Sequence, residues 1–295
     1  MPNWSYNTVV LQGKKEAVHK FIKIGLENSN LQSLNDIDKD WELLCKEGKT
    51  KVNAHDINGS NGEVGTIEME TYLSARTFLP MPDTFLLYDT TNCPNAYPTE
   101  VVKEQKEKYG AIGWYDYNCL TLGTKWNFKL GENDEPTCCP VDGYEDSYRI
   151  VFTCETAWSM PDQWLISIND LVPELFVGIM ANEESGAYYC VCYVSDGDLV
   201  DYADYTNEMD DMWSQFNTNR ENKSKEIRAD EAKMKELRDE VVSENNNLAE
   251  NEIEEEIDTK IEEILDDEYG DCVNDTVIFD KLDESFVKMM DEFIS

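Results

Sequence analysis

The stretch Tyr148-Arg149-Ile150-Val151-Phe152-Thr153-Cys154-Glu155-Thr156 carries the clearest local pattern in this sequence. Its β-branched and aromatic residues predict a strand. Pro161 then suits the first turn of a helix. The apolar residues that follow recur at helical spacing, at Trp164, Leu165, Ile168, Leu171, Val172, Leu175, Phe176 and Ile179. Pro173 should kink or divide this helix, because proline lacks a backbone donor.

The segments on either side continue the same alternation of strands and helices. Residues 6–11 predict a strand, and residues 14–26 predict an amphipathic helix. Residues 187–194 predict a further strand, and Asp196-Gly197 predicts a hairpin turn into a last strand at 199–203. Strand, helix, strand and strand form half of a ferredoxin-like layout, so we expect an α+β fold.

Two domains are expected from the change in composition along the chain. Residues 1–205 should form the α+β ferredoxin-like core, with an insertion around residues 28–65, where the chain is polar and holds two Asn-Gly pairs. Residues 206–295 should form a long, acidic, mainly helical extension. Its last part, with Val277–Phe279 and Phe286–Phe293, is expected to return as a strand and a helix.

The extension contains the most regular acidic pattern. Residues 220–268 contain no Gly or Pro, which predicts a long exposed helix or a helical pair. An apolar residue recurs every fourth position, at Ile253, Ile257, Ile261 and Leu265. One interpretation is a solvated helix with one packed face. The other is an interaction arm that oligomerises the protein or presents carboxylates to a basic groove.

The charge of the chain limits its partners. With 62 Asp and Glu against 25 Lys and Arg, the formal net charge is -37. Nucleic acid and anionic membranes are poor partners for such a surface, because both are bound through cationic side chains. A host protein complex with a basic, DNA-binding surface is a plausible partner, since complementary potentials steer association. The alternative is that the acidity only keeps the protein soluble.

Cysteine usage and hydropathy indicate the compartment. The nine cysteines are odd in number, the chain begins with the polar stretch Met1-Pro2-Asn3-Trp4, and no apolar run is long enough to span a membrane. These features predict reduced cysteines and a cytoplasmic protein.

Few residues support catalysis. The chain has two histidines, His19 and His55, for which structural roles are expected. Its cysteines lack zinc-site spacing, and the glycines at 59, 62 and 65 lack the residues of a phosphate-binding loop. We therefore expect no catalytic residues, no metal and no cofactor. An enzyme hidden in the aromatic segment 114–158 is the less favoured hypothesis.

Four short motifs resemble a known family. They are Met1-Pro2-Asn3-Trp4-Ser5-Tyr6-Asn7, Phe78-Leu79-Pro80-Met81-Pro82, Leu122-Gly123-Thr124-Lys125-Trp126-Asn127 and Thr156-Ala157-Trp158-Ser159-Met160-Pro161. In this order they resemble the YubB-like ferredoxin-like family of phage and plasmid proteins. The resemblance implies a mobile-element origin and a ferredoxin-like core, but no catalytic residues. The length, acidity and helical extension are also similar to phage counter-defence proteins of the anti-Gabija type.

These observations predict a phage-encoded counter-defence protein that binds and inhibits a host antiviral nuclease complex of the Gabija type. It would act in the host bacterial cytoplasm, as a homo-oligomer, by blocking DNA binding or cleavage. A self-assembling phage structural or morphogenesis protein without catalytic activity is the alternative.

The candidate residues fall into three sets. Partner-binding carboxylates are expected at Glu254, Glu255, Glu256, Asp258, Glu262, Glu263, Asp266, Asp267 and Glu268. The self-assembly stripe is expected at Ile253, Ile257, Ile261 and Leu265. Four tryptophans are expected mainly in the core, at Trp4, Trp114, Trp126 and Trp158.

Overall fold

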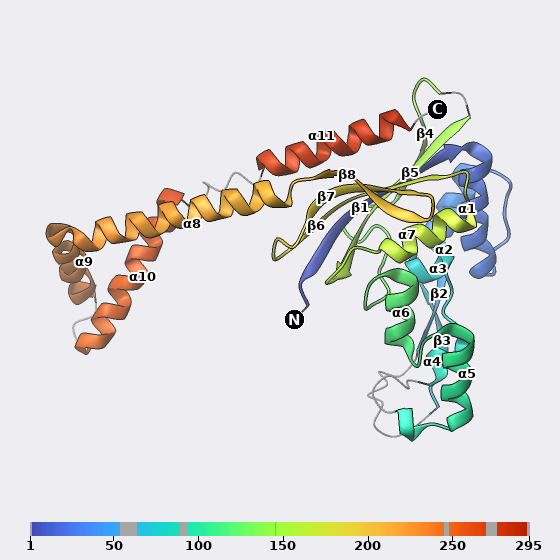
Figure 1. The fold of residues 1–295 in the computed structure, drawn as a ribbon, viewed down its shortest axis with the longest axis horizontal. Coiled ribbons are helices and arrows are strands. Elements are labelled where there is room, and N and C mark those ends of the chain that lie inside the picture. Colours follow the sequence, from blue (N-terminus) through green and yellow to red (C-terminus); the bar gives the residue numbers. More distant parts are fainter. Residues whose placement is uncertain are drawn as a thin grey trace. The chain divides into compact units, whose positions relative to one another are not determined.

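A six-stranded antiparallel sheet forms the centre of a mixed α+β unit (Figure 1). The computed structural model describes residues 2–53, 64–88, 94–144, 146–244, 248–269 and 276–293. The strand order across the sheet is β4 (Thr137–Pro140), β5 (Ser147–Ala157), β1 (Trp4–Lys14), β6 (Phe176–Glu183), β7 (Tyr189–Ser195) and β8 (Asp198–Asp204). The predicted strands at 6–11, 148–156, 187–194 and 199–203 are confirmed as β1, β5, β7 and β8.

The strand β1 organises the sheet because it pairs with β5 on one side and β6 on the other. Val9 lies opposite Phe152 of β5 and Ile179 of β6. Alternate residues of a strand point to opposite faces, so Val9 and Leu11 face one layer and Val10 faces the other. All three are fully buried, which shows that both faces of β1 are covered.

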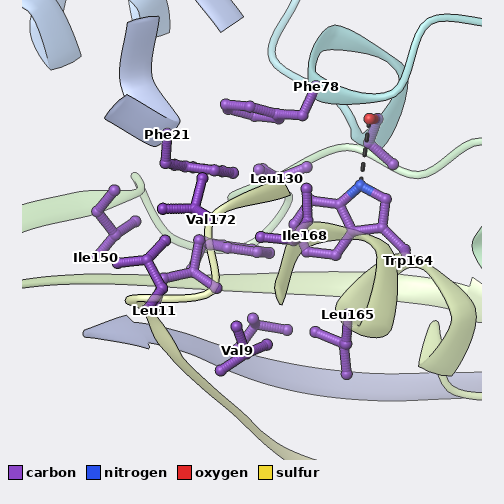
Figure 2. Close-up of a cluster of buried hydrophobic side chains, with 14 of the residues drawn as sticks. Val9, Leu11, Phe21, Phe78, Leu130, Ile150, Trp164, Leu165, Ile168 and Val172 are labelled. Carbon is purple, nitrogen blue, oxygen red and sulfur yellow. Dashed lines mark hydrogen bonds between the residues drawn. The ribbon is translucent and has the colours of Figure 1, made fainter. Parts of the chain in front are cut away.

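Helices α1 (Lys15–Asn28) and α7 (Asp162–Leu171) contribute to one core with the sheet. Trp164 of α7 is fully buried, and its ring meets Phe78, Phe128 and Phe152 edge-on. Figure 2 shows Trp164 with its indole nitrogen directed at a carbonyl oxygen, which is that of Ala75 at 3.3 Å. A buried tryptophan needs such a partner for its N–H group, so this residue fixes α7 in the core.

The second face of the sheet is covered by the end of α11 (Thr276–Glu292). Gly178 of β6 lies directly under this helix, because a Cβ atom added there would come within 2.6 Å of the Met289 side chain. Met289 itself is fully buried. The expected strand at Val277–Phe279 is wrong, since this stretch is the beginning of α11.

The turn at Asp196-Gly197 confirms the predicted hairpin. Both residues have positive φ angles, 53° and 82°, as a two-residue turn that follows the twist of the strands requires. The helix expected to run through Ile179 is shorter than predicted. It ends at Leu171, and Val172 leaves the helical region, with φ -136° and ψ 77°, because the following Pro173 disfavours helical backbone before it. Beyond that point the chain forms β6.

The expected insertion contributes in part to the main core. The helix α2 (Ile37–Glu47) buries Ile37, Trp41 and Leu44 in the same cluster as α1 and α7. A small two-stranded sheet, β2 (Lys49–Asn53) with β3 (Ile67–Thr71), follows. The two Asn-Gly pairs lie outside the described residues. The first part of the expected insertion, helix α2, therefore belongs to the main core.

Several short helices complete this part of the chain. They are α3 (Ala75–Phe78), α4 (Asp83–Leu87), the 3-10 turn η1 (Pro94–Ala96), α5 (Thr99–Tyr109) and α6 (Trp114–Leu122). Phe85, Met81, Leu86 and Ala111 form a small apolar cluster among them.

The chain divides into two compact units. Unit 1 consists of residues Met1–Asp204 with Leu282–Ser295, and unit 2 consists of Tyr205–Lys281. Unit 2 contains α8 (Thr206–Ala229), α9 (Glu231–Glu244) and α10 (Glu250–Tyr269). The expected domain boundary near residue 205 coincides with the start of unit 2, whereas the final residues belong with the sheet. Among the described residues, no helix is long and apolar enough to cross a membrane.

Candidate functional site

The apolar stripe of α10 is buried inside unit 2. Ile257, Ile261 and Leu265 are fully buried, and Ile253 is partly buried beside them. Their partners are Ile227 of α8 with Leu237 and Val241 of α9. Neighbouring helices of the same chain cover this stripe, and its expected role in self-assembly stays a prediction. A four-residue spacing indicates a packed helix face but not whether the partner is another chain.

Four of the predicted partner-binding carboxylates form ion pairs within unit 2. Arg220 of α8 contacts Glu262 at 2.7 Å and Asp266 at 2.6 Å. Arg228 contacts Asp258, and Arg238 contacts Glu254, both at 2.8 Å. These arginines lie on α8 and α9 and face α10. Much of the charge on this side of α10 is therefore balanced internally. The paired acids of α10 are Glu254, Asp258, Glu262 and Asp266.

Three other predicted carboxylates remain unpaired on the surface. Glu255, Glu256 and Glu263 are exposed, and none forms an ion pair with any residue that the structure describes. The side chains of Asp267 and Glu268 lie outside the described set. Unit 2 as a whole holds 25 acidic and 9 basic residues, a formal charge of -16. Its free carboxylates therefore present a negative surface.

An exposed aromatic pair lies on α8 of the same unit. Trp213 is 40% exposed, and its ring meets Phe216 edge-on with centroids 5.5 Å apart. Asp210 and Asp211 precede it on the helix and are both exposed. Tryptophan supplies much of the binding energy where it is found in protein interfaces. Trp213 is not among the predicted site residues, although an aromatic residue close to two acidic ones is a signal that the sequence contains.

A second aromatic surface lies on unit 1 and brings together three of the four motif tryptophans. Lys125 places its Nζ atom 4.8 Å from the ring centroids of both Trp126 and Trp158. Trp4 lies 6.0 Å from Trp126 between ring centroids. Trp126 is 37% exposed and Trp158 is 48% exposed. The expected core role is wrong for these two, and Trp114 lies apart from them, against Tyr115.

Hydrogen bonds between two loops hold this aromatic cluster in place. Thr124 donates to the carbonyl of Ala157 at 3.0 Å, and Ser159 donates to the carbonyl of Gly123 at 2.6 Å. Trp158 has a φ of +68°, in the left-handed region that non-glycine residues rarely occupy. Its backbone N–H donates to Asn3 at 2.8 Å, which fixes this conformation. The structure therefore maintains an unfavourable backbone to keep a large ring exposed.

The remaining candidate groups have structural surroundings. His19 hydrogen-bonds the buried carboxylate of Asp40 at 2.6 Å, whereas His55 lies outside the described residues. Burial raises the pKa of Cys45 and of Cys138 to about 12, so these thiols are poor nucleophiles at neutral pH. The part of the chain that the structure describes contains no group of three or more potential metal-ligating side chains.

Comparisons with known proteins give one distant likeness. No family model matches the chain, and no curated protein matches it. Among solved structures, the chain is similar to the crystal structure of the protein api92 from Yersinia pseudotuberculosis, described with the family model DUF1281. The TM-score is 0.27 at 10% sequence identity, and the match covers 68% of this chain and 97% of that chain. A likeness of this size assigns the chain to no family.

Proposed function

We propose that this chain is a phage-encoded counter-defence protein that binds and inhibits a host antiviral nuclease complex of the Gabija type. The observation that best supports the proposal is the acidic surface of unit 2, where Glu255, Glu256 and Glu263 are exposed and unpaired. A nuclease that holds DNA needs cationic side chains along the phosphate backbone. An acidic protein that covers those side chains blocks DNA binding or cleavage by occlusion.

The physical chemistry of the surface favours a protein partner over a small substrate. Complementary charge increases the rate of encounter and disfavours wrong partners, but it adds little affinity by itself. Affinity comes mainly from a few buried aromatic or arginine side chains at the centre of an interface. Trp213, exposed beside Asp210 and Asp211, is suited to that role. The target would then be a basic surface with an apolar recess.

The finer description of the fold belongs to the same proposal. We infer a ferredoxin-like core of the YubB-like type in unit 1, because α1 and α7 both contribute to one core with an antiparallel sheet whose central strands are β5, β1 and β6. The four sequence motifs support this interpretation. A mobile-element protein of this kind would act in the host bacterial cytoplasm, where antiviral nucleases work.

The direct test is capture of the target from cells. The tagged full-length chain is expressed in a bacterium that carries a Gabija-type system, and the proteins that co-purify are identified. The recovered complex is then assayed for DNA binding and cleavage. We expect the nuclease subunit to be captured and its cleavage to be lost. A clean recovery of the bait alone, in cells where the nuclease is present, would contradict the proposal.

Variants then test whether the acidic surface is responsible. A triple change of Glu255, Glu256 and Glu263 to Gln should weaken capture and restore cleavage, with a larger effect at low salt. The matched control changes the exposed Glu100, Glu104 and Glu107 of α5 to Gln, which alters the net charge equally on unit 1. An equal loss of inhibition in the two triple variants would show that inhibition depends only on the total charge of the protein and not on the position of these carboxylates.

The aromatic cluster of unit 1 favours a second candidate, a self-assembling phage structural or morphogenesis protein. Trp126 and Trp158 are large exposed rings held rigidly, and such residues are enriched at protein interfaces. Sedimentation of the purified chain distinguishes this function. A Trp158→Ala variant should dissociate an oligomer formed through this cluster, whereas an oligomer unaffected by the change would exclude the cluster as the contact.

A further inference from the structure

A cavity of about 470 Å³ lies in unit 1, and its lining includes none of the motif tryptophans Trp4, Trp126 and Trp158. This volume is within the range of small-molecule sites in proteins. Residues of β2, α3, α4 and α6 line it, together with the loops after β3 and α6. The lining side chains that carry the argument are Lys51, Tyr72, Arg76, Phe85, Trp114 and Asn127.

Arg76 is the unusual member of this lining. Its side chain belongs to a residue that is only 4% exposed. The guanidinium group donates to the Leu79 carbonyl, to Asn118 Oδ1 and to Thr121 Oγ1. These three bonds use three of the five N–H groups of an arginine, and the buried Nε atom has no hydrogen-bond partner. Arg76 is therefore incompletely satisfied.

The positive charge of Arg76 also lacks a counter-ion. It forms no ion pair with any carboxylate among the described residues, and its neighbours in hydrogen bonding are neutral. The Tyr117 ring, with its centroid 5.0 Å from Cζ, adds a cation–π contact but no negative charge. Burial lowers the pKa of Arg76 to about 10, so the group still carries its charge at neutral pH. An isolated buried charge is costly, and proteins normally pair it. Lys51, on the same lining, already pairs with Asp83 at 2.8 Å.

The position of Arg76 is fixed before any ligand arrives. Its backbone N–H donates to Asn127 Oδ1 at 3.2 Å, which ties α3 to the loop after α6. Thr50 of β2 hydrogen-bonds the hydroxyls of Ser74 and Thr77, at 2.8 Å and 3.0 Å, in the buried interior. Two walls of the cavity are thus held to the short helix that carries Arg76. A preorganised charge of this kind costs little to engage a ligand.

The other walls are apolar and aromatic. Phe85 and Trp114 line the cavity beside Met81 and Leu86, and Tyr72 lies on the same lining. Aromatic rings bind planar groups by stacking or edge-on contact, with a gain of about 0.5–1.5 kcal/mol beyond the area buried. A ligand that satisfies this lining has a flat ring and one negative group.

We infer that this cavity binds a small organic anion, a planar aromatic or heteroaromatic ring that carries one carboxylate or phosphate group. The anionic group pairs with Arg76 and accepts its free N–H groups. The ring lies against Phe85 and Trp114. The charge of Arg76, which has no carboxylate partner among the described residues, matches a single anionic group.

Calorimetry on the full-length protein tests the ligand class. The probes are nucleoside monophosphates for the phosphate arm and indole-3-acetate for the carboxylate arm. Neutral nucleosides and inorganic phosphate serve as controls that lack the charge or the ring. We expect at least one ring-bearing anion to bind about tenfold or more tightly than both controls. If the nucleoside monophosphates bind more tightly, the anionic group is a phosphate; if indole-3-acetate binds more tightly, it is a carboxylate. Equal binding of a neutral nucleoside, or no binding by any probe, overturns the inference.

Two variants and a control locate the site. Arg76→Met removes the charge and keeps the apolar stem, so anion binding should be lost; Trp114→Leu leaves Arg76 and its bonds in place and should weaken binding through the ring. The control is Arg149→Met on β5, whose guanidinium hydrogen-bonds Gln12 outside the cavity. It should bind as the wild type does. If the folded Arg76→Met variant still binds the anion, the assignment of the anion site to Arg76 is wrong.

Thermal unfolding with and without the probe gives an independent readout of the same charge. Arg76→Met also loses the hydrogen bonds to Leu79, Asn118 and Thr121, so its melting temperature without ligand does not isolate the charge. The ring-bearing anion should raise the melting temperature of the wild type and leave that of Arg76→Met unchanged. If Arg76→Met fails to fold, the charge is structural and the inference rests on the ligand panel and Trp114→Leu, which decide it.

Discussion

The two units of this protein are stabilised in different ways. Unit 1 has a large continuous core in which both faces of a sheet are covered, and its formal charge is -21 over 218 residues. Unit 2 has a charge of -16 over 77 residues. Its own core cluster consists of six buried aliphatic side chains, at Ile227, Leu237, Val241, Ile257, Ile261 and Leu265.

This difference indicates what unit 2 is suited to do. Concentrated like charge destabilises a compact state by self-repulsion. Unit 2 keeps that charge despite a thin core, and offsets only part of it with arginines such as Arg220 and Arg238. A surface retained at a cost in stability is expected to serve binding. The stability of unit 1 depends mainly on apolar burial, which salt does not screen as it screens interactions between charges.

Trp164→Ala should give the largest effect and should act on unit 1. The side chain is fully buried and donates to the Ala75 carbonyl, so the change leaves a large cavity and an unpaired acceptor. Loss of a buried tryptophan costs about 3–5 kcal/mol. Urea unfolding followed by near-ultraviolet circular dichroism measures it. A loss below about 1 kcal/mol would contradict a core centred on this ring.

Ile261→Ala should give the second effect, confined to unit 2. Ile261 is fully buried in the small cluster between α8, α9 and α10, and its truncation should cost about 2–4 kcal/mol. Hydrogen exchange of α10 amides reports the local loss. The matched control is Val242→Ala on the exposed side of α9, which should change little. Equal effects at both positions would show that the stripe is not packed.

Local patterns predicted most of the fold of unit 1, and the failures have identifiable causes. The strand β5 and the hairpin at Asp196-Gly197 depend on short-range signals, and both are confirmed. Phe176 and Ile179 continued a helical spacing, but Pro173 ended the helix and pairing with β1 made the stretch a strand. Tertiary pairing overrode local periodicity, as short apolar runs allow.

The candidate surfaces were harder to predict because they depend on contacts between distant segments. The stripe of α10 was visible, but its partners on α8 and α9 were not. Trp126 and Trp158 looked like core residues, since large rings usually are; their exposure depends on the loop contacts around Thr124 and Ser159. Arg76 gave no signal at all, because the missing counter-ion becomes apparent only in three dimensions.

Asp40→Asn should give an intermediate effect in unit 1 that depends on pH. Burial alone would raise the pKa of Asp40, but hydrogen bonds from His19, Ser33 and the Leu34 amide outweigh it and hold the pKa below its usual value. The stabilisation is therefore complete above the unfolded carboxyl pKa of about 3.9 and is lost as the pH falls through the folded value.

The expected cost of Asp40→Asn at neutral pH is about 1–3 kcal/mol. Urea midpoints of the variant and the wild type should converge as the pH falls below about 4. The exposed Asp142→Asn is the control and should show no such convergence. A difference that stays constant down to pH 3 would mean that the Asp40 carboxylate does not contribute through its charge.

Arg220→Gln should give the smallest effect and separates the two sources of electrostatic energy in unit 2. The change removes the ion pairs with Glu262 and Asp266 and also makes the unit more negative. Lys235→Gln on α9 removes the same charge from an exposed side chain that makes no ion pair with any residue the structure describes. Any loss in Arg220→Gln beyond that in Lys235→Gln measures the pairs, and it should stay below about 1 kcal/mol because exposed pairs are screened.

Salt distinguishes the two contributions further. Added salt weakens specific ion pairs but also relieves the repulsion among the carboxylates of unit 2, and the second effect should dominate at a formal charge of -16. Thermal unfolding of α8 to α10 should therefore shift upward between low and moderate salt, and more steeply in Arg220→Gln than in the wild type. A downward shift in the wild type would mean that the arginine pairs outweigh the repulsion, and that the negative surface costs unit 2 little stability.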